Sequence, residues 1–400
     1  MLDAYIYDGL RSPFGNRAGA LAGNRPDDLL ADVIRAVVKR SPFAVEQFED
    51  VVVGCGNQGG EDSRCVARHA GLLAGLPIEI GGTVLQRNCG SGLGAIVAAS
   101  HALTSGEGEL FITGGVESMS RSPFVVGKAP AAFSREMEVF DSTVGARFPN
   151  PRLIAEFGDD NLAQTADNLA VDYQITREDC DQFALASQQK YAVAAADGFF
   201  AEEIVPVAAA SKRKGPAALV TDDEFPRPTT SLETLGKLRA LNAGGVTTAG
   251  NASGINDGAA VVVLGNRTIG EKTGAKPLAR ILASAVVGVP PRIMGIGPVP
   301  AAKKALQRAG IALSDVDVIE INEAFAAQVL ACLKGLEIAF NDKRVNPNGG
   351  AITVGHPLGA SGARLALTAA RQLQRTGGRY ALVALCVGVG QGIATVIERC

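Results

Sequence analysis

The sequence predicts an α/β fold in which one unit occurs twice, with helices packed between sheets. Short apolar segments alternate with longer helix-like segments, and the order strand–helix–strand–helix–strand appears at residues 51–115 and again at 316–386. Such alternation is typical of parallel strands joined by right-handed crossovers. With 400 residues, 47% of them hydrophobic, the chain is large enough for two core units.

The first copy of the unit begins at a short valine run and ends at two consecutive glycines. β-Branched residues favour strands, and Gly75 and Pro77 predict the end of a helix that precedes them. Cys89 falls in the turn between the second strand and the second helix. We therefore expect strands at 51–53, 82–85 and 110–113, and helices at 64–76 and 91–105.

The second copy has the same order, and segments 91–116 and 361–386 align without a gap. The near-continuous apolar runs of its strands indicate burial on both faces. His356 lies in the turn before its second helix, and Cys386 ends its last strand. We expect strands at 316–321, 351–354 and 380–385, and helices at 323–336 and 362–374.

The segment between the copies has a different character. Thr176 and Asp179 are spaced like a capping box, which predicts a helix from there to about Ala196. A basic turn follows at 212–214, and we interpret it as a solvated surface turn rather than a phosphate site. A segment with helix signals at this length is not a linker. The predicted parts are a first half (1–118 with 247–275), an inserted loop domain (119–246) and a second half (276–400).

Composition argues against several classes of function. The 38 basic and 41 acidic residues give a net charge of -3, so no strong field favours nucleic acid or an anionic membrane. No apolar run approaches the roughly 18 residues of a membrane helix, and the first residues do not resemble a signal peptide. The seven cysteines contain no CxxC pair, which predicts a reduced cytoplasmic protein with neither a disulfide framework nor a metal site.

Cys89 is the first candidate catalytic residue. It follows a predicted strand, precedes a helix and is surrounded by glycines. A helix N-terminus favours a thiolate, and glycines leave backbone N–H groups free to bind an oxyanion. The alternative is an inert cysteine of the core, which is the commoner case in α/β proteins.

His356, Cys386 and Asn322 are further candidates. The other two histidines, His69 and His101, fall within predicted helices, whereas His356 lies in a turn rich in glycine and proline. That setting suggests a base, or else a cap of the next helix. Cys386 precedes alternating glycines at a strand end equivalent to that of the first copy. Asn322 joins a strand to a helix, either as an ordinary N-cap or as an amide that orders a water or a substrate carbonyl.

Together these motifs resemble the four signature blocks of the thiolase family, in the family's order and spacing. Residues 248–254 are similar to the family's CoA-contacting segment, and residues 200–206, 291–300 and 344–350 most resemble the 3-oxoadipyl-CoA thiolases. The four blocks are Asn88-Cys89-Gly90-Ser91-Gly92, Asn322-Glu323-Ala324-Phe325-Ala326, Gly355-His356-Pro357 with Gly359-Ala360-Ser361-Gly362, and Cys386-Val387-Gly388-Val389-Gly390-Gln391-Gly392.

The resemblance implies a layered αβαβα core and CoA-dependent cleavage of a 3-oxoacyl-CoA. His356 would take the proton of Cys89, whose thiolate attacks the 3-keto carbonyl and keeps the acyl group. Cys386 would protonate the departing acetyl-CoA carbanion. Backbone N–H groups of Cys89 and Gly388 would bind one oxyanion, and His356 with a water held by Asn322 would bind the thioester enolate.

The resemblance also implies how CoA binds. CoA would be a co-substrate, with no permanently bound cofactor and no metal, and the partners would be acyl-CoA substrates and further copies of the chain in a homodimer or homotetramer. Ala249, Ser253, Met294 and Phe325 match positions near the pantetheine or the active site, and Arg227 matches a position near the nucleotide.

The substrate and two rival functions stay open at this point. Acetoacetyl-CoA members of the family carry a histidine where this chain has residues 161–164, a stretch that lines the family's acyl pocket. The expected substrate is 3-oxoadipyl-CoA, giving succinyl-CoA and acetyl-CoA, and the alternative is acetoacetyl-CoA. More distant alternatives are a ketoacyl synthase-like condensing enzyme, against which Cys386 and the lack of a second suitable histidine argue, and a non-catalytic acyl-CoA binder.

Overall fold

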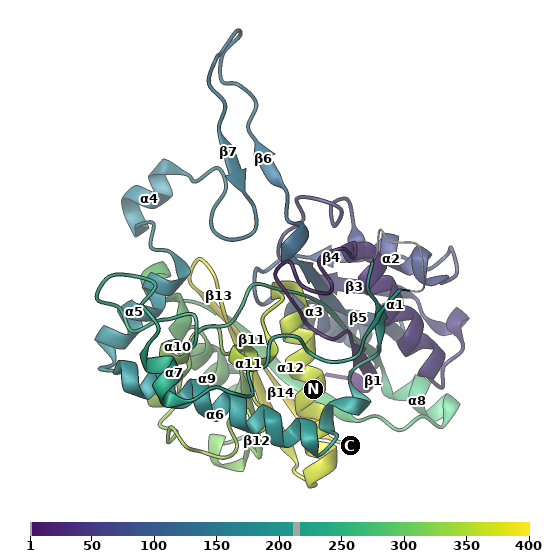
Figure 1. The fold of residues 1–400 in the computed structure, drawn as a ribbon. Helices are drawn as coiled ribbons and strands as arrows, with labels where there is room; N and C mark the ends of the chain where they lie inside the picture. Colours follow the sequence, from purple (N-terminus) through teal and green to yellow (C-terminus); the bar gives the residue numbers. More distant parts are fainter. Residues whose placement is uncertain (1, 211–216) are drawn as a thin grey trace.

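The computed structural model describes residues 2–210 and 217–400, and it arranges them in alternating layers of helix and sheet (Figure 1). The main strands form one continuous path, in the order β12-β13-β14-β11-β1-β10-β5-β3-β4, with β2 beside β10. The first half contributes β1 (Tyr5–Arg11), β2 (Gly15–Asn16), β3 (Asp50–Gly54), β4 (Thr83–Leu85), β5 (Leu110–Ser118) and β10 (Asn256–Gly265). The second contributes β11 (Ala279–Gly288), β12 (Val318–Ile321), β13 (Tyr380–Val387) and β14 (Gln391–Arg399).

The sheet is mixed, which corrects the expectation of parallel strands throughout. β3 pairs in parallel with β4 and β5, and β12 pairs in parallel with β13. The pairs β10–β5 and β13–β14 are antiparallel. Between β13 and β14 a short turn reverses the chain, which allows only antiparallel pairing of these two strands. The two halves meet at β1 and β11, where Tyr5 pairs with Arg280 and Ile6 with Ala279.

The central layer consists of two helices that pack against each other between the halves (Figure 1). One buried cluster joins these helices to strands of both halves, for example through Leu93, Leu367, Val262 and Val383. The backbones approach closely, since a Cβ added at Gly362 would overlap the backbone of Leu93. These helices are α3 (Ser91–Ser105) and α12 (Leu358–Thr376).

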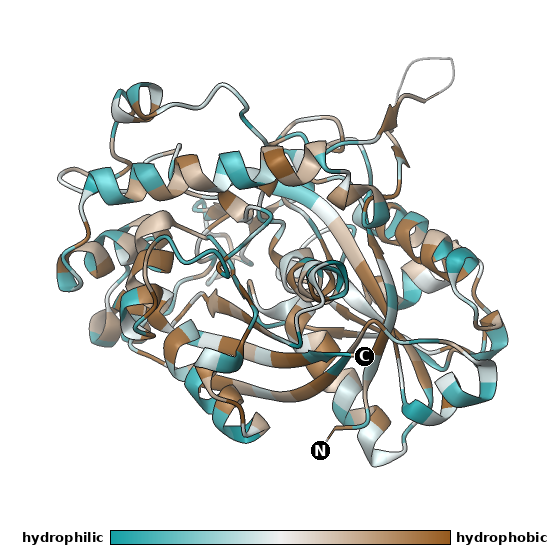
Figure 2. Cartoon of the chain, turned by 90° about the horizontal axis from the view of Figure 1, so that it is seen from below, coloured by the Kyte–Doolittle hydropathy of each residue, from teal (hydrophilic) through white to brown (hydrophobic). Residues whose placement is uncertain are grey.

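Helices also cover both outer faces, which completes the predicted αβαβα order. Separate buried clusters hold the outer helices to the first half and to the second half. The strands are mostly hydrophobic, and the outer helices carry hydrophilic residues on one side (Figure 2). The outer helices are α1 (Pro26–Arg40) and α2 (Val66–Ala74) on the first half, and α9 (Pro298–Ala309) and α10 (Ala326–Gly335) on the second, with α8 (Arg267–Thr273) between β10 and β11.

The inserted segment contains helices that cover the second half and a hairpin that projects from the body (Figure 1). The predicted capping box is confirmed, because the Thr176 side chain accepts a hydrogen bond from the Asp179 N–H at the start of a helix that ends at Ala196. Its elements are β6 (Phe124–Val126), β7 (Val139–Asp141), α4 (Pro151–Phe157), α5 (Leu162–Asp172), α6 (Arg177–Ala196), β8 (Val207–Ala208), β9 (Leu219–Val220) and α7 (Leu232–Gly236). The basic turn at 212–214 lies outside the described residues, and the three-part domain division stays a prediction.

One predicted strand is wrong. Residues 351–354 form α11 (Ala351–Val354), a short helix. The N–H of Ile352 donates to Glu323 Oε2 at 3.1 Å, and a carboxylate at a helix N-terminus stabilises the helix. This tertiary contact overrides the strand preference of the β-branched residues.

Several predicted boundaries also differ by a few residues; for example, the predicted helix at 362–374 is α12 (Leu358–Thr376). The predicted helix at 323–336 begins at Ala326, with Phe325 as its N-cap. The predicted strand at 110–113 continues to Ser118, because Gly114 and Gly115 pair with β10 instead of ending the strand. Short 3-10 turns occur at Val45–Gln47, Met119–Arg121, Phe199–Glu202, Pro291–Ile296 and Leu313–Asp315. Within the described ranges, no helix is both long and apolar enough to cross a membrane.

Candidate active site

Cys89 lies in a rigid turn at the N-terminus of α3, as predicted, and is 7% exposed. Ser91 fixes the turn, because its Oγ donates to the Asn88 carbonyl at 2.6 Å and accepts the Arg87 N–H at 2.8 Å. Asn88 has a φ of 44°, a left-handed conformation that asparagine tolerates better than most residues. The sulfur is thereby presented at the end of the parallel strands.

The turn between β13 and β14 brings Gly388 to the Cys89 sulfur. Asn88 Nδ2 donates to the Gly388 carbonyl at 3.2 Å, which fixes one turn against the other. Burial raises the pKa of Cys89 to about 11, and hydrogen bonds from the N–H groups of Gly388 and Cys89 oppose this rise only in part. The turn alone therefore does not produce a thiolate, contrary to the expectation from the sequence, and the thiol needs a base.

His356 lies in the turn between α11 and α12 and is 4% exposed. Its Nδ1 is 2.6 Å from Ser361 Oγ, and that hydroxyl donates to the Pro357 carbonyl at 2.9 Å. The hydroxyl oxygen therefore accepts the proton on Nδ1, which leaves a lone pair on Nε2. Nε2 is 3.4 Å from Asn322 Nδ2. The backbone N–H of His356 donates to Asn256 Oδ1 at 2.9 Å.

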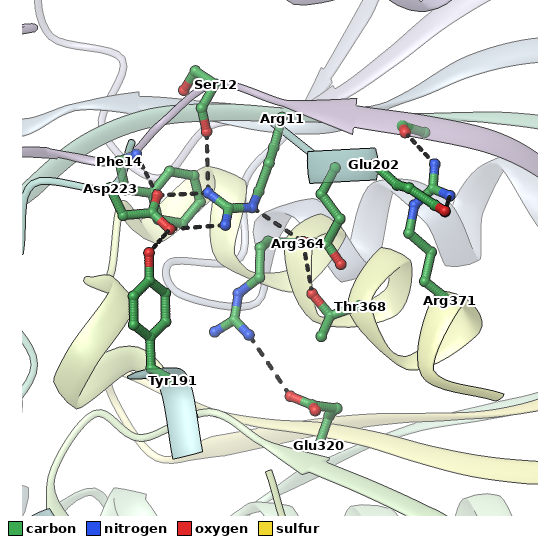
Figure 3. A network of polar contacts seen from close by, with 12 residues as sticks. Arg11, Ser12, Phe14, Tyr191, Glu202, Asp223, Glu320, Arg364, Thr368 and Arg371 are labelled. Carbon is green, nitrogen blue, oxygen red and sulfur yellow. Dashed lines mark hydrogen bonds and ion pairs between the residues drawn. The ribbon is translucent and has the colours of Figure 1, made fainter. Parts of the chain in front are cut away.

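Electrostatics keep His356 neutral. Burial, with a smaller contribution from the nearby Arg364 guanidinium, lowers its pKa to about 3. Arg364 is itself buried on α12, 3.7 Å from Glu320 Oε2 (Figure 3). Burial raises the pKa of Glu320 to about 8. His356 does not cap α12, whose N-cap is Pro357 without a side-chain bond, so the capping alternative is wrong and the role of base stays open.

Asn322 lies between β12 and α10 and is fully buried. It does not cap α10, so the N-cap interpretation is wrong. Its backbone N–H donates to the Ala384 carbonyl at 3.0 Å, and its Oδ1 accepts no hydrogen bond within the described part of the chain. The amide is therefore positioned beside His356 with an oxygen available for a water or a substrate group.

Cys386 lies near the end of β13 and is 1% exposed. Burial raises the pKa of its thiol well above the ordinary value, and the neighbouring Cys89 adds to this rise. A thiol held protonated in this way is suited to donate a proton rather than to attack. Met294 and Ala324 pack against Cys386 in one small buried cluster, with Leu162 and Phe325 at its edge.

The predicted CoA-contacting residues fall into two groups. Met294 and Phe325 adjoin Cys386, and Ser253 is joined to the same region because its N–H donates to the Ala324 carbonyl at 3.0 Å. Ala249 and Arg227 are exposed. The Arg227 guanidinium lies 5.5 Å from the centre of the Phe225 ring, and its backbone N–H donates to Gln188 Oε1 at 2.9 Å.

Several supporting residues were given no role from the sequence. Asn256 and Ser361 hold the His356 turn, and Asn88 holds the Gly388 turn. Glu117 and Glu323 are buried carboxylates. A charged residue at the end of an apolar strand was the available signal for Glu117, because a buried carboxylate requires several hydrogen bonds.

Comparison with known proteins gives consistent matches over the whole chain. The family described as thiolase, N-terminal domain, matches residues 4–268, and the thiolase C-terminal domain matches 275–399. The beta-ketoadipyl-CoA thiolase of Pseudomonas putida is 55% identical over 100% of both chains. The structure of the Bacillus anthracis acetyl-CoA acetyltransferase has a TM-score of 0.93 at 37% identity, covering 100% of this chain and 99% of that one.

A structure of human mitochondrial 3-ketoacyl-CoA thiolase in complex with CoA has a TM-score of 0.91 at 37% identity, covering 100% of this chain and 98% of that one. Identity at this level over complete chains goes beyond a shared fold, and the layered architecture agrees with it. The chain therefore belongs to the thiolase family and is an acyltransferase enzyme.

Proposed function

We propose that this enzyme cleaves 3-oxoadipyl-CoA with CoA, giving succinyl-CoA and acetyl-CoA. The observation that carries the proposal is the 55% identity, over complete chains, to a thiolase named for beta-ketoadipyl-CoA, which is the same compound. Identity to the structurally similar acetyl-CoA acetyltransferase is lower, at 37%.

In the first step Cys89 gives its proton to Nε2 of His356 and attacks the 3-keto carbonyl. The lone pair on Nε2 supports this role, since Ser361 accepts the proton on Nδ1. Burial raises the pKa of Cys89 to about 11 and lowers that of His356 to about 3, so little free thiolate forms before the reaction begins. Proton transfer would therefore accompany carbon–sulfur bond formation, which places the charge on the substrate oxygen.

That oxygen would accept hydrogen bonds from the N–H groups of Cys89 and Gly388, which already face the sulfur. Each such donor typically contributes roughly 3–4 kcal/mol to the transition state. The C2–C3 bond then breaks, and the electron pair moves onto the acetyl-CoA enolate.

The enolate would be held by His356, now protonated on Nε2, and by a water bound to Asn322. The Cys386 thiol would give its proton to C2 and release acetyl-CoA. CoA would then enter as the co-substrate, and its thiol would give its proton to the Cys386 thiolate and attack the succinyl thioester. The bond between the succinyl carbonyl and Cys89 breaks, and the departing Cys89 sulfur takes back the proton held on His356 Nε2. No permanently bound cofactor is required for these steps, because the thioester itself acidifies C2.

For CoA we propose Ser253, Met294 and Phe325 along the pantetheine, with Ala249 at the entrance and Arg227 at the nucleotide. Met294 and Phe325 adjoin Cys386, and the Ser253 N–H donates to the carbonyl of Ala324 in the same cluster. Ala249 and Arg227 are exposed, as expected for groups that meet the outer end of a long ligand.

We also propose a homodimer or homotetramer in the cytoplasm. Large apolar side chains are exposed along the β6–β7 hairpin and the loop after it, which favours burial against another copy. All seven cysteines are free, as expected in a reducing compartment. The exposed apolar residues include Phe124, Val126, Phe133, Met137, Val139 and Phe148.

The alternative substrate is acetoacetyl-CoA, and a substrate panel separates the two. Purified enzyme would be assayed with 3-oxoadipyl-CoA, acetoacetyl-CoA and a medium-chain 3-oxoacyl-CoA, each with CoA, by loss of the 3-oxoacyl thioester. We expect the highest kcat/KM with 3-oxoadipyl-CoA. An equal or higher value with the medium-chain substrate would contradict a preference for the dicarboxylic acyl group, and a preference for acetoacetyl-CoA would support the alternative.

A further inference from the structure

We propose that Glu117 is a positioning residue that holds the turn carrying His356 against the turn carrying Cys89. Glu117 lies near the end of β5 and is 1% exposed. Its Oε2 accepts the N–H groups of Gly56 at 2.8 Å and of Gly359 at 2.9 Å, and its Oε1 accepts that of Asn57 at 2.9 Å. The proposal rests on the catalytic roles given above to Cys89 and His356.

On one side the carboxylate binds the first turn of α12. Gly359 is the second residue of this helix and follows His356 by three positions. N–H groups in the first turn have no partner within the helix, and a negative charge there is favourable. Glu117 thereby fixes the start of α12, which directly follows His356 and carries its partner Ser361 near its N-terminus.

On the other side the carboxylate binds the loop after β3, which leads to Cys89. The carbonyl of Gly56 accepts Gln86 Nε2 at 3.1 Å, and the same nitrogen donates to Asn88 Oδ1 at 3.1 Å. Asn88 precedes Cys89 and holds Gly388. A path of hydrogen bonds therefore runs from Glu117 to both proposed oxyanion donors.

Around this carboxylate the backbone segments lie in direct contact, because several of the residues are glycines and no side chain keeps the segments apart. A Cβ at Gly359 would overlap the Val116 carbonyl, and one at Gly115 would overlap the Gly359 carbonyl. A Cβ at Gly56 would lie 2.9 Å from Glu117 Oε2 and 3.3 Å from the Cβ of Leu358. The separation of the two turns is therefore set by backbone contact and by the hydrogen bonds that Glu117 accepts.

The titratable groups that face Glu117 are a second carboxyl group and two thiols. Burial, with a smaller contribution from the Asp62 carboxylate, raises the pKa of Glu117 to about 7 although the backbone N–H groups oppose the rise. Cys55 and Cys89 are the other titratable groups that the Glu117 charge affects. The direction of the pH dependence follows from the raised pKa of Glu117. Above about pH 7 the carboxylate is charged and accepts all three N–H groups, whereas below it a proton occupies one acceptor and the positioning is lost.

A metal site is the competing interpretation of this cluster. Ligand atoms of Cys55, Asp62 and Glu117 lie within 4.8 Å of one another. However, both Glu117 oxygens already accept backbone N–H groups, and the Cys55 thiol donates to the Asn57 carbonyl at 3.3 Å. These bonds favour a carboxylate that organises the backbone.

The test compares Glu117→Gln with the wild-type enzyme and with Glu107→Gln, an exposed glutamate in the connection before β5. In Glu117→Gln an amide NH₂ would face backbone N–H groups. We expect kcat to fall about 10- to 100-fold through misplacement of the reacting groups, with KM for CoA changed less than twofold. Glu107→Gln should keep wild-type values.

The pH profile of kcat supplies a readout that a purely structural role would not move. Wild-type kcat should decline below about pH 7 because Glu117 becomes protonated. This acidic limb of the profile should be absent from Glu117→Gln. It should be retained in Glu320→Gln, which replaces the other buried glutamate with a raised pKa. Persistence of the limb in Glu117→Gln, wild-type kcat in that variant, or one bound metal ion per chain by elemental mass spectrometry would overturn the proposal.

If Glu117→Gln does not fold, as judged by circular dichroism, the wild-type profile decides: a flat kcat between pH 6 and 8 overturns the proposal, and a limb retained in Glu320→Gln supports it. Failure of the proposed function would be seen separately from failure of the Glu117 proposal. If Cys89→Ala retained thiolysis activity, Cys89 would not be the nucleophile, whatever the result with Glu117→Gln.

Discussion

The single proton on the His356 ring decides what the residue can do. With a pKa of about 3 the ring is neutral, and only the nitrogen that lacks the proton can accept one from Cys89. Ser361 Oγ, 2.6 Å from Nδ1, accepts the proton there, and its own proton is committed to the Pro357 carbonyl. A serine hydroxyl thus takes the orienting role that a carboxylate has in many catalytic triads.

Replacing this hydroxyl should therefore slow catalysis without unfolding the protein. In Ser361→Ala the Nδ1 proton loses its acceptor and the other tautomer becomes populated. We expect kcat/KM to fall about 10- to 100-fold, which is part of the roughly 10²–10⁴ that general-base catalysis contributes. Steady-state thiolysis checks this, with Ser105→Ala at the exposed end of α3 as the matched control; equal effects of the two substitutions would contradict the tautomer argument.

Local sequence was sufficient to nominate some residues of the site and insufficient for others. Cys89 and His356 stand in glycine-rich turns next to helices, which is a local signal. Asn256 contacts His356 from 100 positions away, and Glu117 contacts Gly359 from 242 positions away. These contacts form only when the chain folds, so local sequence spacing does not predict them.

At the scale of elements, α3 and α12 bring the two halves of the site together. The N-terminus of α3 presents Cys89 and that of α12 follows His356. Their backbones approach so closely that a Cβ at Gly362 would overlap Leu93. Protein interiors do not accommodate such overlap without moving the backbone.

A methyl group at this crossing should destabilise the protein. Gly362→Ala is expected to lower the free energy of unfolding by about 1–3 kcal/mol, the usual cost of overpacking, and to lower kcat because the helices separate. Denaturant unfolding measures the first effect. Gly236→Ala on α7, where an added Cβ meets no atom within 4 Å, should change stability by less than about 0.5 kcal/mol. A neutral Gly362→Ala would show that the helices are not tightly packed.

The sequence predicted most elements because hydrophobic period and helix signals are local. It failed at 351–354, where β-branched residues form α11. The carboxylate of Glu323 binds the Ile352 N–H from a different loop, and no local pattern contains that contact. The mixed strand directions were also missed, since apolar runs reveal burial but not direction.

For the whole molecule, duplication explains why the site lies between the halves. Cys89 comes from the first copy, whereas Asn322, His356 and Cys386 come from the second. Each half supplies a strand end followed by a glycine-rich turn, and the packing of α3 on α12 brings these turns together. Neither half alone contains both the nucleophile and the proposed base.

The proposed reaction depends on an acyl group carried by Cys89, and trapping this group tests the mechanism directly. Enzyme would be mixed with 3-oxoadipyl-CoA without free CoA, quenched in acid, digested and examined by mass spectrometry. The mechanism predicts a succinyl thioester on the peptide containing Cys89, released by added CoA and absent from Cys89→Ala. A succinyl group on the Cys386 peptide instead, or acetyl-CoA formed with no acyl-enzyme, would contradict it.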